Sequence, residues 1–94
     1  MMLYEFVAES YGGIECTITL VNAESAQEAL IEYCKDTGEL NDAFMEAIRK
    51  VGFDNAMSIA NSQLSSGIIS VHEVGNTIYT RPNYRIHTIG EDTV

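Results

Sequence analysis

The 94-residue sequence lacks several features that define large classes of protein. It has no tryptophan, one proline and two cysteines, too few for a disulfide-stabilised framework. It has no apolar run of about 20 residues, which excludes a membrane-spanning helix. Glu5 and Glu9 interrupt the N-terminal segment, and no lysine or arginine precedes Lys35, so no secretory signal is expected there. We therefore expect one small cytoplasmic domain over residues 1–94, with residues 90–94 frayed.

Basic residues are also scarce, and the acidic residues are unevenly placed. The chain holds 14 aspartates and glutamates against five lysines and arginines, a formal net charge of −9. Residues 1–46 contain ten of the acidic side chains and only Lys35 as a base, so this segment carries the whole net charge. Such a field repels DNA and RNA, which are bound through cations that neutralise phosphates, and it attracts a basic protein surface. A charged surface can also serve solubility alone.

Motifs that would indicate catalysis or metal binding are absent as well. Gly12-Gly13 lies between two predicted strands and not before a helix, so it is no phosphate-binding loop. Cys16, Cys34, His72 and His87 show no close pair at metal-ligand spacing, and the two cysteines are expected to be buried small side chains. The carboxylates are expected on exposed helix, where no burial would raise a pKa for acid catalysis. We expect no enzyme activity, no cofactor and no metal.

Alternation with period two predicts an antiparallel hairpin over residues 2–21. In the first strand Tyr4, Phe6 and Ala8 share one face. Residues 10–13 supply a turn, since glycine accepts positive φ without a Cβ clash. In the second strand an apolar set alternates with polar residues, formed by Ile14, Cys16, Ile18 and Leu20.

Three helices are predicted next. Ser25 and Glu28 form a capping box that starts a helix at Ala26, and Gly38 stops it. Its apolar stripe follows helical spacing and consists of Ala26, Ala29, Leu30, Tyr33 and Cys34.

The second helix is predicted over residues 42–51, with Asn41 as N-cap and Gly52 closing it. Asp54 is the predicted cap of the third helix, which residues 65–67 end.

The C-terminal part returns to period two. Strands over residues 68–74 and 77–81 flank the predicted two-residue loop Gly75-Asn76, and a last strand is predicted over residues 84–89. The whole is an α+β fold, with an N-terminal β-hairpin, three helices and a C-terminal antiparallel β-hairpin or meander, the helices packed on one face of the sheet. Whether the two hairpins join one sheet is left open.

Acidic side chains recur at every fourth position of the first helix. Steps of four place side chains next to one another along a helix, here away from the apolar stripe. Like charges at this spacing cost about 0.2–0.5 kcal/mol per pair, which a basic partner would turn into binding specificity. The alternative is a solvated helix face. We name as the acidic row the residues Glu24, Glu28, Glu32, Asp36 and Glu39.

A second candidate surface lies on the late hairpin. The predicted register pairs His72 with Tyr79 and puts both on one face with Ser70 and Arg81. No group there would orient a catalytic base, but tyrosine and arginine are enriched in protein interfaces. Tyr11, at the tip of the first hairpin, is the tyrosine expected to be most exposed. The partner-binding candidates are therefore the acidic row, Tyr11, His72, Tyr79 and Arg81.

In its size, its acidic row, its α+β plan and its missing catalytic motifs, the chain resembles the small acidic anti-CRISPR proteins of phages and mobile elements. The resemblance implies a non-enzymatic inhibitor in the host cytoplasm, which occupies the basic groove of a nucleic-acid-handling host protein and excludes DNA or guide RNA. The acidic row would imitate phosphates, since helical steps of four recur about every 6 Å. The alternative is a structural module that forms a homodimer through a hairpin edge or the His72–Tyr79–Arg81 face.

Overall fold

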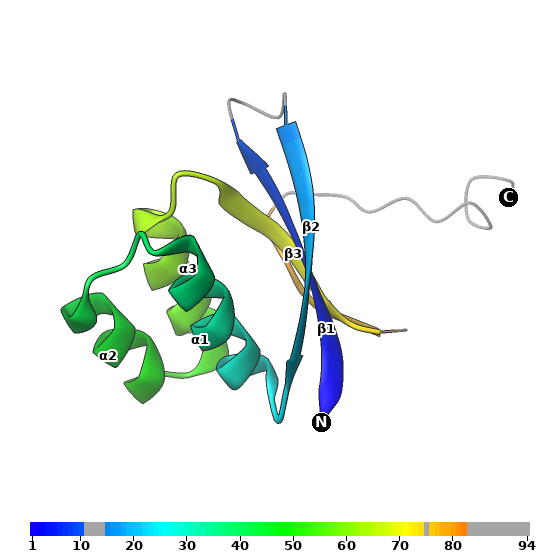
Figure 1. The fold of residues 1–94 in the computed structure, drawn as a ribbon, viewed down its shortest axis with the longest axis horizontal. Helices are drawn as coiled ribbons and strands as arrows, with labels where there is room; N and C mark the ends of the chain where they lie inside the picture. The colour runs from blue at the N-terminus through cyan, green and yellow to red at the C-terminus, as the bar shows by residue number, and fades with distance from the viewer. Residues whose placement is uncertain (11–14, 75, 83–94) are drawn as a thin grey trace, which may run out of the picture.

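The fold is α+β, with a four-stranded antiparallel sheet and three helices on one side of it (Figure 1). A computed structural model describes residues 1–10, 15–74 and 76–82 of the chain. The strand order is β2-β1-β3-β4, so both hairpins join one sheet through the antiparallel pair β1 and β3. Within the described residues, no helix has the length and apolar content needed to cross a membrane. In chain order the elements are β1 (Met2–Ser10), β2 (Glu15–Ala23), α1 (Ala26–Thr37), α2 (Asp42–Lys50), α3 (Phe53–Gln63), β3 (Gly67–Glu73) and β4 (Asn76–Thr80).

The predicted first hairpin is confirmed. β1 and β2 pair in an unbroken antiparallel register, from Met2 opposite Ala23 to Ser10 opposite Glu15. β2 therefore runs two residues past the predicted end of the hairpin. The candidate residue Tyr11, which is predicted at the tip of this hairpin, is outside the described residues.

The predicted limits of the first helix are confirmed by its two caps. The Ser25 hydroxyl accepts a hydrogen bond from the Glu28 N–H at 3.2 Å, which satisfies a donor that the first turn leaves open. At the other end Gly38 has a φ of 67°, and its N–H donates to the carbonyls of Cys34 and Lys35. This left-handed conformation suits glycine, so the helix ends there.

The boundary between the second and third helices differs from the prediction. Asn41 is the N-cap of α2, as predicted, and its side chain accepts from the Phe44 N–H at 3.0 Å. Gly52, however, does not close α2 but is the N-cap of α3. Its carbonyl accepts the first α3 bond from the Ala56 N–H at 2.9 Å, so Asp54 lies inside the first turn and is not the cap.

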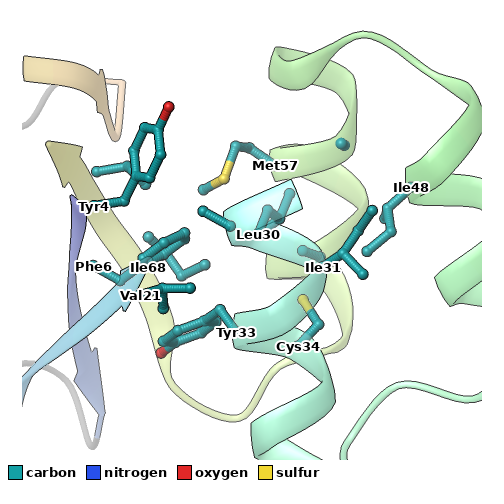
Figure 2. Packing of buried hydrophobic residues seen from close by; sticks show 14 of the residues in the cluster. Tyr4, Phe6, Val21, Leu30, Ile31, Tyr33, Cys34, Ile48, Met57 and Ile68 are labelled. Atoms are coloured by element: carbon teal, nitrogen blue, oxygen red, sulfur yellow. The ribbon is translucent and has the colours of Figure 1, made fainter. Parts of the chain in front are cut away.

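The hydrophobic core lies between the sheet and the three helices (Figure 2). At its centre Phe6 of β1 stacks on Tyr33 of α1, with ring centroids 4.7 Å apart. Burial of a large apolar side chain stabilises a fold by about 1.5–3 kcal/mol, so this layer fixes which face of the sheet the helices cover. Its largest fully buried side chains are Phe6, Leu30, Ile48, Met57, Ile68, Val71 and Cys34.

The apolar set of β2 lies on the opposite, open face of the sheet. Phe6 pairs with Thr19, so Thr19 faces the helices and its neighbours Ile18 and Leu20 face away. Ile18 is 65% exposed and Leu20 is 59% exposed. The prediction that Cys16 is buried is therefore wrong, because it belongs to the same outward set and is exposed.

The register of the second hairpin also differs from the prediction. Asn76 is not a loop residue but begins β4, where it pairs with Glu73. The register then shifts between Val71 and His72, so that Tyr79 pairs with Val71 and not with His72. A bulge of this kind re-aims every side chain beyond it. The last strand predicted over residues 84–89, and the tail at 90–94, lie outside the described residues.

Candidate functional site: an acidic groove beside an edge strand

Four members of the acidic row line one side of a groove. Because α1 directly follows β2, it runs back along that strand, and the two elements border an open surface hollow of about 450 Å³. The strand side of the hollow is formed by the end of β2, from Leu20 to Ala23. The helix side carries four carboxylates, from Glu24, Glu28, Glu32 and Asp36. The structure thus brings together the residues that the helical spacing grouped.

The groove continues toward the start of β2. A second hollow, of about 310 Å³, shares Asp36 with the first and is lined on the strand side by Thr17 and Thr19. Glu39 and Tyr33 stand on its helix side. We name the two hollows together the acidic groove, which follows most of the length of β2.

The charges of the acidic row are little compensated. Lys35 lies 3.5 Å from Glu32, and both side chains are about half exposed, at 53% and 49%. Solvent screening leaves such a pair at about 0–1 kcal/mol. Among the described residues no other lysine or arginine forms an ion pair with the row, since the remaining pairs join Arg49 to Glu46 and Arg81 to Glu9. The negative potential of the acidic groove therefore faces outward.

Glu39 differs from the other four because it is bonded within the fold. Its carboxylate accepts hydrogen bonds from the Ser65 N–H at 2.7 Å and the Ser65 hydroxyl at 3.0 Å. It thereby ties the end of α1 to the segment between α3 and β3. Burial, and then the Glu39 charge, raises the pKa of the Cys34 thiol to about 11, and burial also raises the pKa of Tyr33. Glu39 is accordingly a structural member of the row.

The second predicted surface is not formed. Tyr79 lies on the helix side of the sheet, where its ring meets that of Phe53 edge-on at 6.4 Å. His72 is on the other face, with its Nε2 atom 3.1 Å from the hydroxyl oxygen of buried Ser70. Arg81 donates a hydrogen bond to the carboxylate of Glu9, which belongs to the open face of β1. The register shift between β3 and β4 therefore separates Tyr79 from His72, which the predicted pairing placed opposite each other.

Sequence reasoning missed two residues that the structure adds to the site, Ile18 and Leu20. They lie on the strand that borders the acidic groove and present apolar side chains to solvent. The sequence did carry a signal for this exposed apolar surface. The end of β2 is apolar on both faces, and one of these faces had to remain uncovered.

No group of three or more His, Cys, Asp or Glu in residues 1–10, 15–74 and 76–82 is arranged to hold a metal ion. Comparisons with protein-family models, with curated proteins and with solved structures find no match. The function is therefore argued from the geometry of the acidic groove.

Proposed function

We propose that this chain is a non-enzymatic binding protein that inhibits a nucleic-acid-handling protein by occupying its basic groove. The observation that supports the proposal is the exposed face formed by α1 and the residue before its N-cap, where four carboxylates stand beside one half-exposed lysine. A basic groove that normally holds phosphates offers the complementary charge.

The energetics of the free protein point the same way. Neighbouring carboxylates four residues apart repel one another by about 0.2–0.5 kcal/mol per pair. Asp36 stands in the last turn of α1, where the helix dipole favours a cation. The arrangement is unfavourable for the isolated helix and becomes favourable against a cationic surface. Attraction of this kind raises association rates and weakens as salt rises.

The test is capture of basic nucleic-acid-binding proteins on the immobilised chain, at about 0.05 M and about 0.5 M salt. We expect capture at low salt, loss of capture at high salt, and competition between the protein and DNA or RNA for the captured partner. The double variant Glu28→Lys with Glu32→Lys should lose both binding and competition. The double variant Glu46→Lys with Asp54→Lys makes the same change in net charge on α2 and α3 and should keep both. Inhibition that survives in a folded Glu28→Lys, Glu32→Lys protein would rule out the acidic row as the inhibitory surface.

The exposed side chains Ile18 and Leu20 favour a second candidate function, a homodimer formed through the edge of β2. A two-fold continuation of the sheet would keep both helix layers on one side and set the two acidic rows against each other. Such a dimer would therefore strengthen as salt rises, whereas binding to a basic partner weakens. Sedimentation of the protein alone across the same salt range separates the two functions.

A further inference from the structure

We infer that the outer edge of β2 accepts an extended segment of the partner as a fifth strand, with basic side chains at alternate positions facing the acidic row. The inference rests on the proposed function, because it names the part of a basic partner that the acidic groove holds.

The first support is the free edge itself. β2 spans nine residues at the end of the sheet and has β1 as its neighbour. In the described part of the chain, none of the backbone bonds outside regular helix and strand pairing involves Glu15–Ala23. Alternate N–H and C=O groups of β2 therefore point away from β1, ready to pair with another chain.

The second support is that this edge lacks several of the devices by which proteins protect exposed strands. Native edges are blocked by charged side chains, above all lysine, by proline, by bulges or by short length. β2 contains no lysine, arginine or proline, and its pairing with β1 shows no register shift. A regular edge of this length is a template for strand addition.

The two faces of the added strand specify its chemistry. Successive side chains of a strand point to opposite faces of the sheet. On the helix face the added strand would meet the carboxylates of the acidic groove. On the open face it would lie beside Ile18 and Leu20, which are exposed. The complementary segment therefore alternates lysine or arginine with apolar residues.

The repeat distances agree with this arrangement. Four helical residues advance about 6 Å, and two strand residues advance about 6.8 Å. Within α1 the acidic row runs from Glu28 to Asp36 over about 12 Å, close to the length of about 14 Å that a strand covers in four steps. Three alternate basic residues of a five-residue segment can thus each meet one of the carboxylates of Glu28, Glu32 and Asp36.

The test uses three kinds of synthetic peptide, each of nine residues to match the length of β2. The first alternates lysine and valine. The second has the same composition with the lysines grouped at one end. The third is the alternating peptide N-methylated either at every lysine or at every valine, which removes alternate backbone donors. Binding to the full chain is followed by calorimetry at low salt, at concentrations where the peptides sediment as monomers.

We expect the alternating peptide to bind at least about ten-fold more tightly than the grouped one. One of the two N-methylated peptides should lose binding and the other keep it, because only alternate amides of a strand face its neighbour. The variant Glu28→Lys with Glu32→Lys should lose the alternating peptide, and the control Glu46→Lys with Asp54→Lys should retain it.

Equal affinity for the alternating and grouped peptides would overturn strand addition. If the Glu28→Lys, Glu32→Lys variant also lost this affinity, the proposed acidic docking surface would remain in place. Insensitivity to both N-methylated peptides would overturn strand addition in the same way. A dimer of the protein alone that Ile18→Lys dissociates would identify a second copy as the occupant of the edge and would also overturn the inference. Loss of partner capture at every salt concentration would instead contradict the proposed function.

Discussion

Among the described residues the sheet ends at β2 on one side and at β4 on the other, and these two strands differ in almost every property that decides whether a strand pairs with another chain. The β2 edge is nine residues long, unbroken in register and bordered by the acidic groove. The β4 edge is five residues long, carries a register shift, and is followed by Arg81 and Pro82. Short length, a bulge, a cation and a proline are the common ways of preventing edge pairing.

In residues 1–10, 15–74 and 76–82, the β4 side has the features of a protected edge, whereas β2 has no register shift, lysine or proline. The open edge is also the one against which four carboxylates are aligned. Charge beside an unprotected strand also keeps two copies of the chain apart, and the opposite salt dependence of partner binding separates the two roles. The coincidence of edge and charge is the observation that supports the proposed binding surface.

The largest expected effect is a loss of stability of the whole sheet, which would disrupt both of its outer strands. Phe6 is fully buried on β1, pairs with Thr19 on one side and Val71 on the other, and stacks on Tyr33. Phe6→Ala should lower the free energy of unfolding by about 3–5 kcal/mol in urea titrations. Phe44→Ala, at a half-buried position of α2, is the matched control and should cost much less. Equal losses in the two variants would contradict the position of the core.

A second substitution should loosen the β3–β4 side and leave β2 intact. The Asn61 side chain accepts from the Ile68 N–H at 2.9 Å and donates to the Ile68 carbonyl at 3.1 Å. Asn61→Ala removes the side chain that bonds the N–H and C=O groups of buried Ile68. It should lower the free energy of unfolding by about 2 kcal/mol. Amide hydrogen exchange should quicken in β3 and not in β2. Asn55→Ala, exposed on the same helix, is the control, and equal exchange changes in the two strands would refute the separation of the two sides.

The two cysteines contrast the edge strand with the core. Cys34 has its pKa raised from 9.0 to about 11, so the folded state keeps a proton that the unfolded chain releases. The contribution of the Cys34 thiol to the free energy of unfolding is therefore fully present below pH 9.0. It is lost as the pH rises toward about 11, by an amount on the order of 2 kcal/mol. Tyr33, whose pKa is also raised, acts in the same direction. Urea titrations across this range measure the loss.

The controls use each cysteine in turn. Cys34→Ala should flatten the pH dependence, whereas Cys16→Ala should leave it unchanged, because Cys16 is exposed on β2. Iodoacetamide should modify Cys16 in the folded protein and Cys34 only after unfolding. Labelling of both thiols at one rate in the folded state is the contrary result.

The smallest expected effect is a gain in stability. Asp36→Lys would place a cation in the last turn of α1, four residues after Glu32, and should raise the free energy of unfolding by about 0.5 kcal/mol at low salt. Glu28→Lys, in the first turn, should lower it slightly. Both should weaken binding of the alternating peptide. If Asp36→Lys stabilises the protein and binds the peptide unchanged, Asp36 takes no part in the site.

Local signals predicted most of the fold. Ser25 and Asn41 marked the starts of two helices through their capping side chains, and alternation in β1 grouped Tyr4, Phe6 and Ala8, which the structure buries, on one face. The acidic row followed from helical spacing alone. These features depend on neighbours a few residues apart, which a sequence displays directly.

Non-local pairing was harder to predict. The outward set of β2 includes Ile18, and only its register with β1 shows that this set faces solvent. The shift between Val71 and His72 moved Tyr79 to the helix face, and a bulge has no required residue type. The adjacency of β1 and β3 brings together strands far apart in the chain. The groove between α1 and β2, and therefore the free edge beside the acidic row, could be seen only once these pairings were known.

The most direct test of the central claim is amide hydrogen exchange of the protein with and without the alternating lysine–valine peptide. The account predicts that exchange slows at alternate residues of β2, from Glu15 to Ala23, and is unchanged in β4. Slowing in β4, or binding with no change in β2, would contradict it.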